Sequence, residues 1–321
     1  MDDRTHRSAD EASVEAMRSA TSHLPLHRTV IAGRYAMLDQ IGAGGMGSVW
    51  RARDERTGEV VAVKVLGHHN AALLVRFVRE QAMRVRHPHV VAPIGWAADD
   101  DLVVLAMDLV AGGSVQDLLD EHGHLPAGYA AALLEQLLQA LAAVHGAGLV
   151  HRDVKPANLL LQPGGGGPPH LRLGDFGVAA PVADARWTTV PGAIGTEGYM
   201  APEQARGALP DPAQDLYAVG RVGLQLVTGL PPDRQGAIGS GPLRPLLERL
   251  LVVDPEQRLA SADAALRLLR RLDIGFEEGP TIPDRLGGGP PLDFDWRAWT
   301  AVAACLGAVA LCVAVVVGAL L

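Results

Sequence analysis

Short apolar runs of strand length fill the chain between Arg34 and Met107, where glycines and polar turns separate them. Runs of about four to eight residues that are rich in β-branched side chains and bounded by turn residues are typical of β-strands. The segments expected to form strands are Tyr35 to Ile41, Val49 to Ala52, Val60 to Val65, Val90 to Ile94 and Leu102 to Met107. This part of the chain is therefore predicted to be mainly β.

Apolar residues recur at intervals of three and four in other segments, which is typical of helices that bury one face. Leu134, Leu137, Leu138 and Leu141 show this spacing most clearly, and Gly146 is expected to end their helix. Helices are expected at Ala71 to Arg86, Leu133 to His145, Asp215 to Val227 and Ala262 to Leu272, with a short one at Asp10 to Ser19. Most of the helical sequence thus follows the β-rich part.

One stretch, His151 to Gly177, carries most of the candidate chemistry. It opens with His-Arg-Asp-Val-Lys-Pro-Ala-Asn and closes with Asp-Phe-Gly, and two apolar runs flank a Gly/Pro-rich tip between them. This order predicts a loop, a β-hairpin and a second loop, so that Asp153, Asn158 and Asp175 face one cleft. One carboxylate can then accept a proton from a hydroxyl, while an amide oxygen and the second carboxylate can bind Mg²⁺. The alternative is an ordinary polar hairpin with a chance Asp-Phe-Gly, and the order and spacing of both motifs weigh against it.

A glycine-rich loop, Gly42-Ala43-Gly44-Gly45-Met46-Gly47, lies between two of the expected strands. In a dinucleotide-binding fold such a loop would open a helix, whereas here β-rich sequence and a turn follow it. Glycines allow backbone N–H groups to approach phosphate oxygens without a side-chain clash. We interpret the loop as a flap over nucleotide phosphates, although in isolation a glycine-rich hairpin without a ligand is an equally good interpretation.

Composition narrows the function further. The net charge of −8 gives no general basic field, so we expect no nucleic acid partner. Among the 28 basic residues only Lys64 and Lys155 are lysines, which suggests that these two places need a compact ammonium group. The two cysteines, Cys305 and Cys312, both lie in an apolar tail, and this distribution fits a reducing cytoplasm.

The two ends of the chain differ from its middle. Residues 1–33 lack an apolar signal-peptide run and are expected to form a flexible leader. Residues 273–297 are a Pro/Gly-rich, partly acidic stretch that we interpret as a juxtamembrane linker. Residues 298–321 carry no charge, and at about 1.5 Å per residue a helix of this length can cross a bilayer core of about 30 Å. A single-pass transmembrane helix is therefore predicted, with Trp296 and Trp299 at the interface and the N-terminal side in the cytoplasm.

The motifs, taken together and in this order, resemble those of bacterial eukaryotic-like serine/threonine protein kinases. The resemblance covers about residues 34–272 and implies an α+β, bilobal fold. The implied parts are a small β-rich N-lobe with one main helix at 34–107, a hinge at 108–113 and a larger helical C-lobe at 114–272. By family pattern, Asp153 accepts the proton of a substrate hydroxyl, Lys155 steadies the γ-phosphate and favours Ser/Thr substrates, and Asn158 and Asp175 bind Mg²⁺, with Mn²⁺ as an alternative.

The same resemblance implies an ATP site formed by the glycine loop, one strand, one helix and the hinge. Lys64 would hold the α- and β-phosphates with Glu80 as its partner, and Met107 would lie behind the adenine. The residues expected at this site are Ile41, Gly42, Ala43, Gly44, Gly45, Met46, Gly47, Ser48, Val49, Ala62, Lys64, Glu80, Met107, Asp108 and Val110.

The segment from Asp175 to Ala201-Pro202-Glu203 resembles a kinase activation segment. Thr188 and Thr189 are the expected regulatory phosphosites, with Arg152 as the acceptor of a phosphate there, and ordinary loop threonines are the alternative. Thr196 matches the substrate-side threonine that touches the catalytic Asp and Lys. Three further matches are structural, namely Asp215 as a buried aspartate at a helix start and Glu203 paired with Arg258.

One departure from the family is a short connection at residues 233–241, where a longer stretch with a docking helix is usual. The resemblance implies ATP-dependent phosphorylation of protein Ser/Thr hydroxyls. The alternative is a membrane-anchored pseudokinase scaffold, which binds partners without turnover. A non-kinase nucleotide-binding domain is a third hypothesis, and it would leave Asp153 and Asp175 without a role. Protein substrates, the lipid bilayer and a homodimer or cytoplasmic activator are the expected partners.

Overall fold

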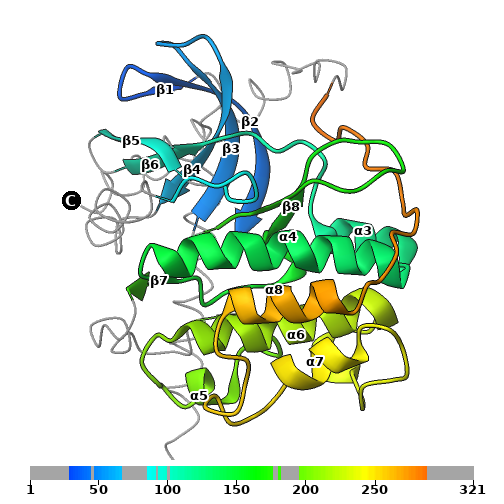
Figure 1. The fold of residues 1–321 in the computed structure, drawn as a ribbon. Coiled ribbons are helices and arrows are strands. Elements are labelled where there is room, and N and C mark those ends of the chain that lie inside the picture. Colours follow the sequence, from blue (N-terminus) through cyan, green and yellow to red (C-terminus); the bar gives the residue numbers. More distant parts are fainter. Residues whose placement is uncertain are drawn as a thin grey trace, which may run out of the picture. The chain divides into compact units, whose positions relative to one another are not determined.

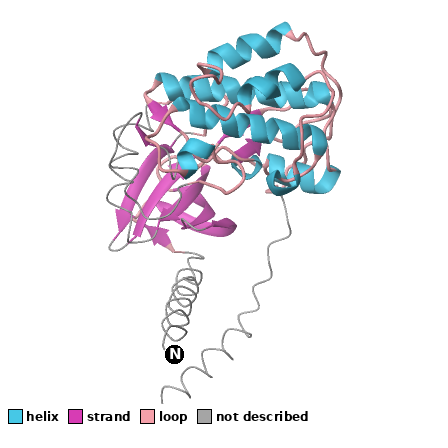
Figure 2. Cartoon of the chain, turned by 90° about the horizontal axis from the view of Figure 1, so that it is seen from below, coloured by secondary structure: helices cyan, strands magenta, loops and turns pink. Residues whose placement is uncertain are grey.

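The computed structural model describes residues 29–44, 47–66, 85–91, 93–99, 102–175, 180–181 and 195–287. Strands and helices separate into two regions of one compact unit, which ends at Arg285 (Figures 1 and 2). The β-strands are β1 Val30–Ile31, β2 Tyr35–Gly44, β3 Gly47–Asp54, β4 Val60–Leu66, β5 Pro93–Asp99, β6 Leu102–Met107, β7 Leu149–Val150, β8 Leu159–Leu161, β9 Leu171–Leu173 and β10 Ala180–Pro181. The helices are α3 Val115–His122, α4 Ala127–Gly146, α5 Pro202–Ala205, α6 Pro212–Thr228, α7 Arg244–Leu250 and α8 Ala262–Arg271, with 3-10 turns η2 Pro156–Asn158 and η5 Pro232–Arg234.

The N-lobe sheet has the order β1-β2-β3-β4-β6-β5, and all its pairs are antiparallel. Its buried face includes Met37, Trp50, Val63 and Val104, which pack together as one apolar cluster. The predicted strands are confirmed, with one correction. The strand expected at Val90 to Ile94 runs instead from Pro93 to Asp99, because His89 and Val91 form backbone hydrogen bonds with Leu173 and Val90 makes an isolated bridge there, away from the sheet.

The C-lobe is organised around α4, whose leucines are buried against α6, α8 and β9 (Figure 1). The predicted helix at Leu133 to His145 is confirmed and begins earlier, at Ala127. The helix α6 likewise begins before the expected Asp215, because Asp211 caps it and Pro212 opens it. Among the described residues, α4 alone is long and apolar enough to cross a membrane, but its burial in the domain marks it as a core helix.

The boundary expected at residue 272 needs correction, because the chain continues along the domain after α8. Glu277 and Ile282 contact the start of α4 and the tip between β8 and β9, and Arg285 reaches the end of the hinge. Residues 273–285 are therefore part of the folded unit, although their Pro/Gly-rich composition indicated a linker. The leader expected at 1–33 also needs correction at its end, because Val30 and Ile31 form β1, which pairs with β2. Residues 1–28, most of the expected helix at Ala71 to Arg86, and the predicted membrane helix at 298–321 lie outside the described residues.

Candidate active site

The loop between β7 and β8 carries His151 to Asn158, and one buried carboxylate anchors its start. Asp215, in the first turn of α6, accepts hydrogen bonds from the backbone N–H groups of His151 and Arg152 at 2.8 and 2.7 Å. His145, near the end of α4, lies 2.8 Å from the same carboxylate through its Nε2. Asp215 is only 1% exposed, so water cannot replace these contacts. The loop therefore depends on α6 and α4 for its shape.

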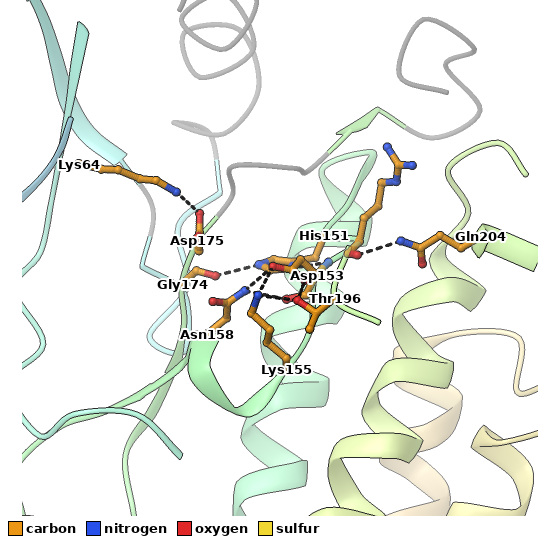
Figure 3. Close-up of polar contacts among 10 residues, drawn as sticks. Lys64, His151, Asp153, Lys155, Asn158, Gly174, Asp175, Thr196 and Gln204 are labelled. Atoms are coloured by element: carbon orange, nitrogen blue, oxygen red, sulfur yellow. Dashed lines mark hydrogen bonds and ion pairs between the residues drawn. The ribbon is translucent and has the colours of Figure 1, made fainter. Parts of the chain in front are cut away.

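Asp153 lies at the centre of a group of polar side chains (Figure 3). Its Oδ1 accepts a hydrogen bond from the Thr196 hydroxyl at 2.7 Å, and its Oδ2 lies 2.9 Å from Lys155 Nζ. Lys155 Nζ also donates to the Thr196 hydroxyl at 2.6 Å, which closes a triangle of carboxylate, ammonium and hydroxyl. Asn158 Nδ2 donates to the Asp153 carbonyl and carboxylate at 2.8 and 3.0 Å. The structure thus brings together the predicted residues Asp153, Lys155, Asn158 and Thr196.

The second acidic residue, Asp175, follows the hairpin of β8 and β9 as expected. The two strands pair from Leu159–Leu173 to Leu161–Leu171, which returns the chain to the edge where the first loop lies. The His151 ring, through Nε2, hydrogen-bonds the Gly174 carbonyl at 2.9 Å and joins the two loops directly. Asp175 then lies opposite Lys64 on β4, with Nζ 2.5 Å from Oδ1 (Figure 3). Two acidic loops and one lysine therefore meet, as the sequence predicted.

Two residues in these loops have a left-handed backbone. Arg152 has φ of 67° and Asp175 has φ of 57°. Side chains other than glycine adopt this region only at a cost of order 1 kcal/mol, and such residues gather at functional sites where the surroundings hold them. Here the holding contacts are the Asp215 carboxylate below Arg152 and the Lys64 ammonium on Asp175.

The sheet places the other expected nucleotide-binding residues beside Lys64. Lys64 pairs with Val49 on β3 and with Leu105 on β6, and Ala62 pairs with Met107. Because alternate residues of a strand share a face, Val49, Ala62, Lys64 and Met107 lie on one side of the sheet. The glycine loop is confirmed as a connection between strands, since Gly42 to Gly44 at the end of β2 pair with Val49 to Gly47.

The family model for the protein kinase domain matches residues 35–267, most of the chain. The chain belongs to the protein kinase family. The match spans strands β2 to β6 of the N-lobe sheet, the loops that carry Asp153 and Asp175, and the helices as far as the first half of α8.

Named relatives of this kinase domain come from several bacteria. It is 35% identical over 279 residues to the serine/threonine-protein kinase PkaA of Streptomyces coelicolor, and this match covers 77% of this chain and 51% of that protein. It is 35% identical over 288 residues to pkn3 of Myxococcus xanthus, covering 79% and 53%, and 37% identical over 221 residues to PknL of Mycobacterium tuberculosis, covering 67% and 54%. The chain thus spans about half the length of these curated relatives.

A divalent metal and ATP are generally used by this family, and the kinase domain offers suitable atoms for both. Asn158 donates through Nδ2 to Asp153, so its amide oxygen is the atom left to accept or coordinate. That oxygen and the Asp175 carboxylate form the hard oxygen donor set that Mg²⁺ or Mn²⁺ prefers, with phosphate oxygens completing it. The residues present therefore fit a metal held jointly by the protein and a nucleotide.

Burial changes the electrostatics of the loop that carries Asp153. Burial alone would raise the pKa of Asp215, but the hydrogen bond and charge of His145, with the nearby His151, hold that pKa below its ordinary value. Burial lowers the pKa of Arg152, an effect that the Asp215 charge opposes. Asp215 therefore remains ionised as the acceptor that holds the catalytic loop.

The kinase domain also contains the predicted pair of Glu203 and Arg258. Arg258 donates from both terminal nitrogens to the Glu203 carboxylate, at 2.8 and 3.2 Å, and its side chain is fully buried. A bidentate pair of this kind is charge-assisted and geometrically specific. It joins α5, beside Thr196, to the segment before α8, so it supports the substrate side of the site.

Two contributors were missed in the sequence. Gln204 donates to the Arg152 carbonyl at 2.9 Å, and His145 contacts Asp215. Gln204 directly follows the recognised Ala-Pro-Glu, and His145 ends the strongest helical pattern. Their positions beside these features could have drawn attention to them, but nothing in their residue types indicated the contacts that they make. Of the predicted residues, Gly45, Met46, Glu80, Thr188 and Thr189 lie outside the described residues.

The hinge residues take positions between the two regions. Val110 is buried, and the Asp108 carboxylate accepts a hydrogen bond from Arg172 Nη2 on β9 at 2.7 Å. Gly112 N donates to the Leu161 carbonyl and Leu161 N donates to the Gly113 carbonyl, both at 2.9 Å. The hinge is thereby fixed to β8, the strand that follows the Asp153 loop.

Proposed function

We propose that the chain is a serine/threonine protein kinase that transfers the γ-phosphate of ATP to Ser or Thr hydroxyls of proteins. The observation that carries this proposal is the triangle of Asp153, Lys155 and Thr196 facing the pair of Asp175 and Lys64. Membership of the protein kinase family and relatives named serine/threonine-protein kinases support it.

In the proposed reaction, Asp153 orients the attacking hydroxyl and accepts its proton at a carboxylate oxygen. The Thr196 hydroxyl already donates to Asp153 Oδ1 at 2.7 Å. A substrate hydroxyl would donate to the same carboxylate in the same way. Lys155, 2.9 Å from the carboxylate, supplies positive charge where a transferred phosphate would lie. ATP with Mg²⁺ supplies the phosphoryl group and neutralises its charge, with Asn158 and Asp175 holding the metal and Lys64 the phosphates.

The proposal is tested by phosphate transfer from labelled ATP to the chain itself and to a generic Ser/Thr substrate. Asp153→Asn keeps the size of the side chain but removes the proton acceptor, and we expect at least a roughly hundredfold loss of rate. Lys64→Met is expected to abolish transfer as well. Asp233→Asn is the matched control, because the Asp233 side chain is 75% exposed and its ion pair is with Arg234 rather than with Lys64 or Lys155. Equal label in wild type and both site variants would disprove the assignment.

The pseudokinase alternative receives no specific support from the described residues. Its motivation was the short connection at 233–241, and the structure folds that connection against α6. Arg221 donates to the Pro232 carbonyl at 2.6 Å, and Gln235 donates back to the Arg221 carbonyl at 3.2 Å. The C-lobe is therefore closed at this point without a longer insertion.

We further propose that Thr188 or Thr189 is autophosphorylated and raises the activity, with Arg152 as the phosphate acceptor. Phosphate carries three acceptor oxygens and pairs strongly with guanidinium. The support is that Arg152 adjoins Asp153, so a phosphate bound there would act directly on the catalytic loop. Mapping by mass spectrometry tests this, and a fully active preparation with both threonines unmodified would contradict it.

Membrane attachment through residues 298–321 is also proposed, with the kinase domain in the cytoplasm and lateral dimerisation as a means of activation. The support is an uncharged segment long enough to span the bilayer core, with Trp296 just before it and Trp299 at its start. Expression of the full chain and of residues 1–287, followed by membrane fractionation with alkaline extraction, tests the anchor. Release of the full chain from membranes by alkali would contradict it.

A further inference from the structure

The segment after α8 follows a defined course along the kinase domain. In Figure 1 it continues, in orange, from α8 past the ends of α4 and α3. We call residues 273–285 the strap. Its contacts fall at three places, namely the start of α4, the tip between β8 and β9, and the end of the hinge.

The strap completes α4, the central helix of the C-lobe. The residue at the N-cap of α4 is Pro126, which supplies no capping side chain. Glu277 of the strap supplies the missing acceptor, since its Oε2 receives a hydrogen bond from the backbone N–H of Gly128 at 2.6 Å. A carboxylate at this position also interacts favourably with the helix dipole. The strap therefore provides the cap of α4, which is a specific contact with the domain.

The strap then pairs with the tip of the β8–β9 hairpin. Ile282 and Gly164 exchange backbone hydrogen bonds in both directions at 2.9 Å, as in a short antiparallel bridge. The Ile282 side chain is only 3% exposed and packs into the main apolar cluster of the C-lobe. Burial of an isoleucine side chain stabilises a contact by about 1.5–3 kcal/mol relative to leaving the side chain exposed.

At its end the strap contacts the hinge through Arg285. The backbone N–H of Arg285 donates to the Ala111 carbonyl at 2.8 Å, and its Nε donates to the Gly112 carbonyl at 3.2 Å. Its Nη2 reaches the Glu121 carboxylate on α3 at 2.7 Å. One arginine therefore ties two consecutive hinge carbonyls to the helix that follows the hinge.

Glycines on both sides make this close approach possible. A Cβ on Gly112 would come within 2.5 Å of Ile282, and one on Gly113 within 2.6 Å of Arg285. A Cβ on Gly128 would meet the Gly275 carbonyl at 2.2 Å, and glycine at 279 avoids the ring of Tyr129 in the same way. Distances below 3.0 Å are incompatible with a side chain, so the sequence of the domain fits the strap.

We propose that Arg285 is a positioning residue for the nucleotide site, because it fixes the backbone directly after the hinge residues expected to bond the adenine. The Arg285 side chain holds the Gly112 carbonyl, two residues after Val110, so the loss of this contact would also shift the peptide groups of Asp108 to Val110. This inference rests on the proposed function, which assigns the hinge to ATP. It predicts that Arg285, which lies within the expected juxtamembrane linker at 273–297, influences ATP affinity.

The test compares Arg285→Ala with Arg270→Ala in the purified full chain. Arg270 is the matched control, because it also forms an ion pair with a glutamate, Glu135, but lies on α8 away from the hinge. The measurements are the KM for ATP, kcat, the dissociation constant of a fluorescent ATP analogue, and the melting temperature. Because one lost hydrogen bond changes an equilibrium by roughly two- to tenfold, Arg285→Ala should weaken ATP binding by that factor and leave kcat little changed.

Arg285→Lys should restore part of the affinity, since an ammonium can reach one of the two side-chain acceptors, and Arg270→Ala should leave it unchanged. An Arg285→Ala protein that melts lower but binds ATP as the wild type does would overturn the inference and leave the strap a purely structural element. If the wild type binds ATP more tightly than Arg285→Ala, as expected, but transfers no phosphate, the proposed function fails and the inference holds. If the wild type binds no ATP, both are wrong.

Discussion

Asp215 offers the most direct test of how α6 holds the catalytic loop. Replacing it with alanine removes the acceptor of two backbone N–H groups and of His145, all within 2.8 Å. The carboxylate is 1% exposed, so water does not take its place at these donors. An unsatisfied buried donor costs about 1–3 kcal/mol, and partial relaxation of the loop reduces the sum. We therefore expect Asp215→Ala to lower the free energy of unfolding by roughly 3–6 kcal/mol.

That loss is a large part of the stability of a typical domain, about 5–15 kcal/mol, so a milder variant is needed as well. Asp215→Asn keeps one acceptor oxygen but turns an amide N–H₂ toward a backbone donor, and we expect a loss of roughly 2–4 kcal/mol. Because both variants release the backbone of His151 and Arg152, the phosphate transfer rate should fall even where the protein remains folded. Urea denaturation followed by circular dichroism, together with the transfer assay, measures both effects.

Asp211 provides the control on the same helix. Its carboxylate caps α6 by accepting from Ala213 N at 2.8 Å, but it is exposed and touches no part of the catalytic loop. Asp211→Ala should cost about 1 kcal/mol, as is usual for an N-cap, and leave the transfer rate unchanged in folded protein. If Asp215→Ala cost no more than Asp211→Ala and kept full activity, the argument that α6 holds the loop through this carboxylate would be refuted.

The pH dependence gives an independent check on Asp215. Its pKa in the folded protein is held below the ordinary value of 3.8 by the contacts with His145 and His151 despite its burial. The unfolded chain therefore binds this proton first, and the stabilisation is present above about pH 4 and lost as the pH falls through the folded pKa. Wild type should therefore lose more stability between pH 5 and pH 3 than Asp215→Asn does. Parallel curves for the two proteins would contradict the assignment.

Three further outcomes follow from other contacts. Arg258→Ala leaves the Glu203 carboxylate without its ion-pair partner, and urea denaturation should show that the free energy of unfolding falls by roughly 3–5 kcal/mol. A fall of less than about 1 kcal/mol would contradict this expectation. Burial lowers the pKa of His89 below 6.5, although its bond to the Leu171 carbonyl opposes this. The folded state therefore binds fewer protons than the unfolded chain, and stability should fall as the pH drops below about 6.5. Urea midpoints measured between pH 7 and 5 should change less with pH in a His89→Gln variant than in wild type. Gly128→Ala places a methyl group against the strap, and increased hydrogen exchange or proteolysis at residues 273–285 should report its release, whereas an unchanged exchange pattern would be contrary evidence.

The active-site residues could be predicted because their chemistry is tied to short, ordered motifs. Asp153, Lys155 and Asn158 are within six positions of one another, and the hairpin of β8 and β9 brings Asp175 to the same place by strand pairing alone. Thr196 was placed correctly despite its distance in sequence, because its family position relative to Ala-Pro-Glu is defined. The expected contact of Lys64 and Glu80 remains a prediction, since Glu80 lies outside the described residues.

The remaining features depend on tertiary contacts that leave little trace in composition. Val90 was assigned to a strand from its apolar neighbours, but the residues on either side of it, His89 and Val91, form backbone hydrogen bonds with Leu173 of the other lobe. The strap looked like a linker because glycine and proline are typical of linkers, whereas here Gly279 and Pro280 lie against Tyr129. Local patterns indicate which segments are regular, but they do not indicate which irregular segments are packed.

The scarcity of lysine has a practical consequence for chemical labelling. Lys64 and Lys155 are the two lysines of the chain, and both lie in the active site with side chains only 9% and 25% exposed. An amine-acylating reagent therefore has no lysine elsewhere in this sequence to modify. Acylation of the two ammonium groups, followed by mass spectrometry, becomes a direct reporter of site occupancy, in which a bound ligand is detected as protection without background from surface lysines.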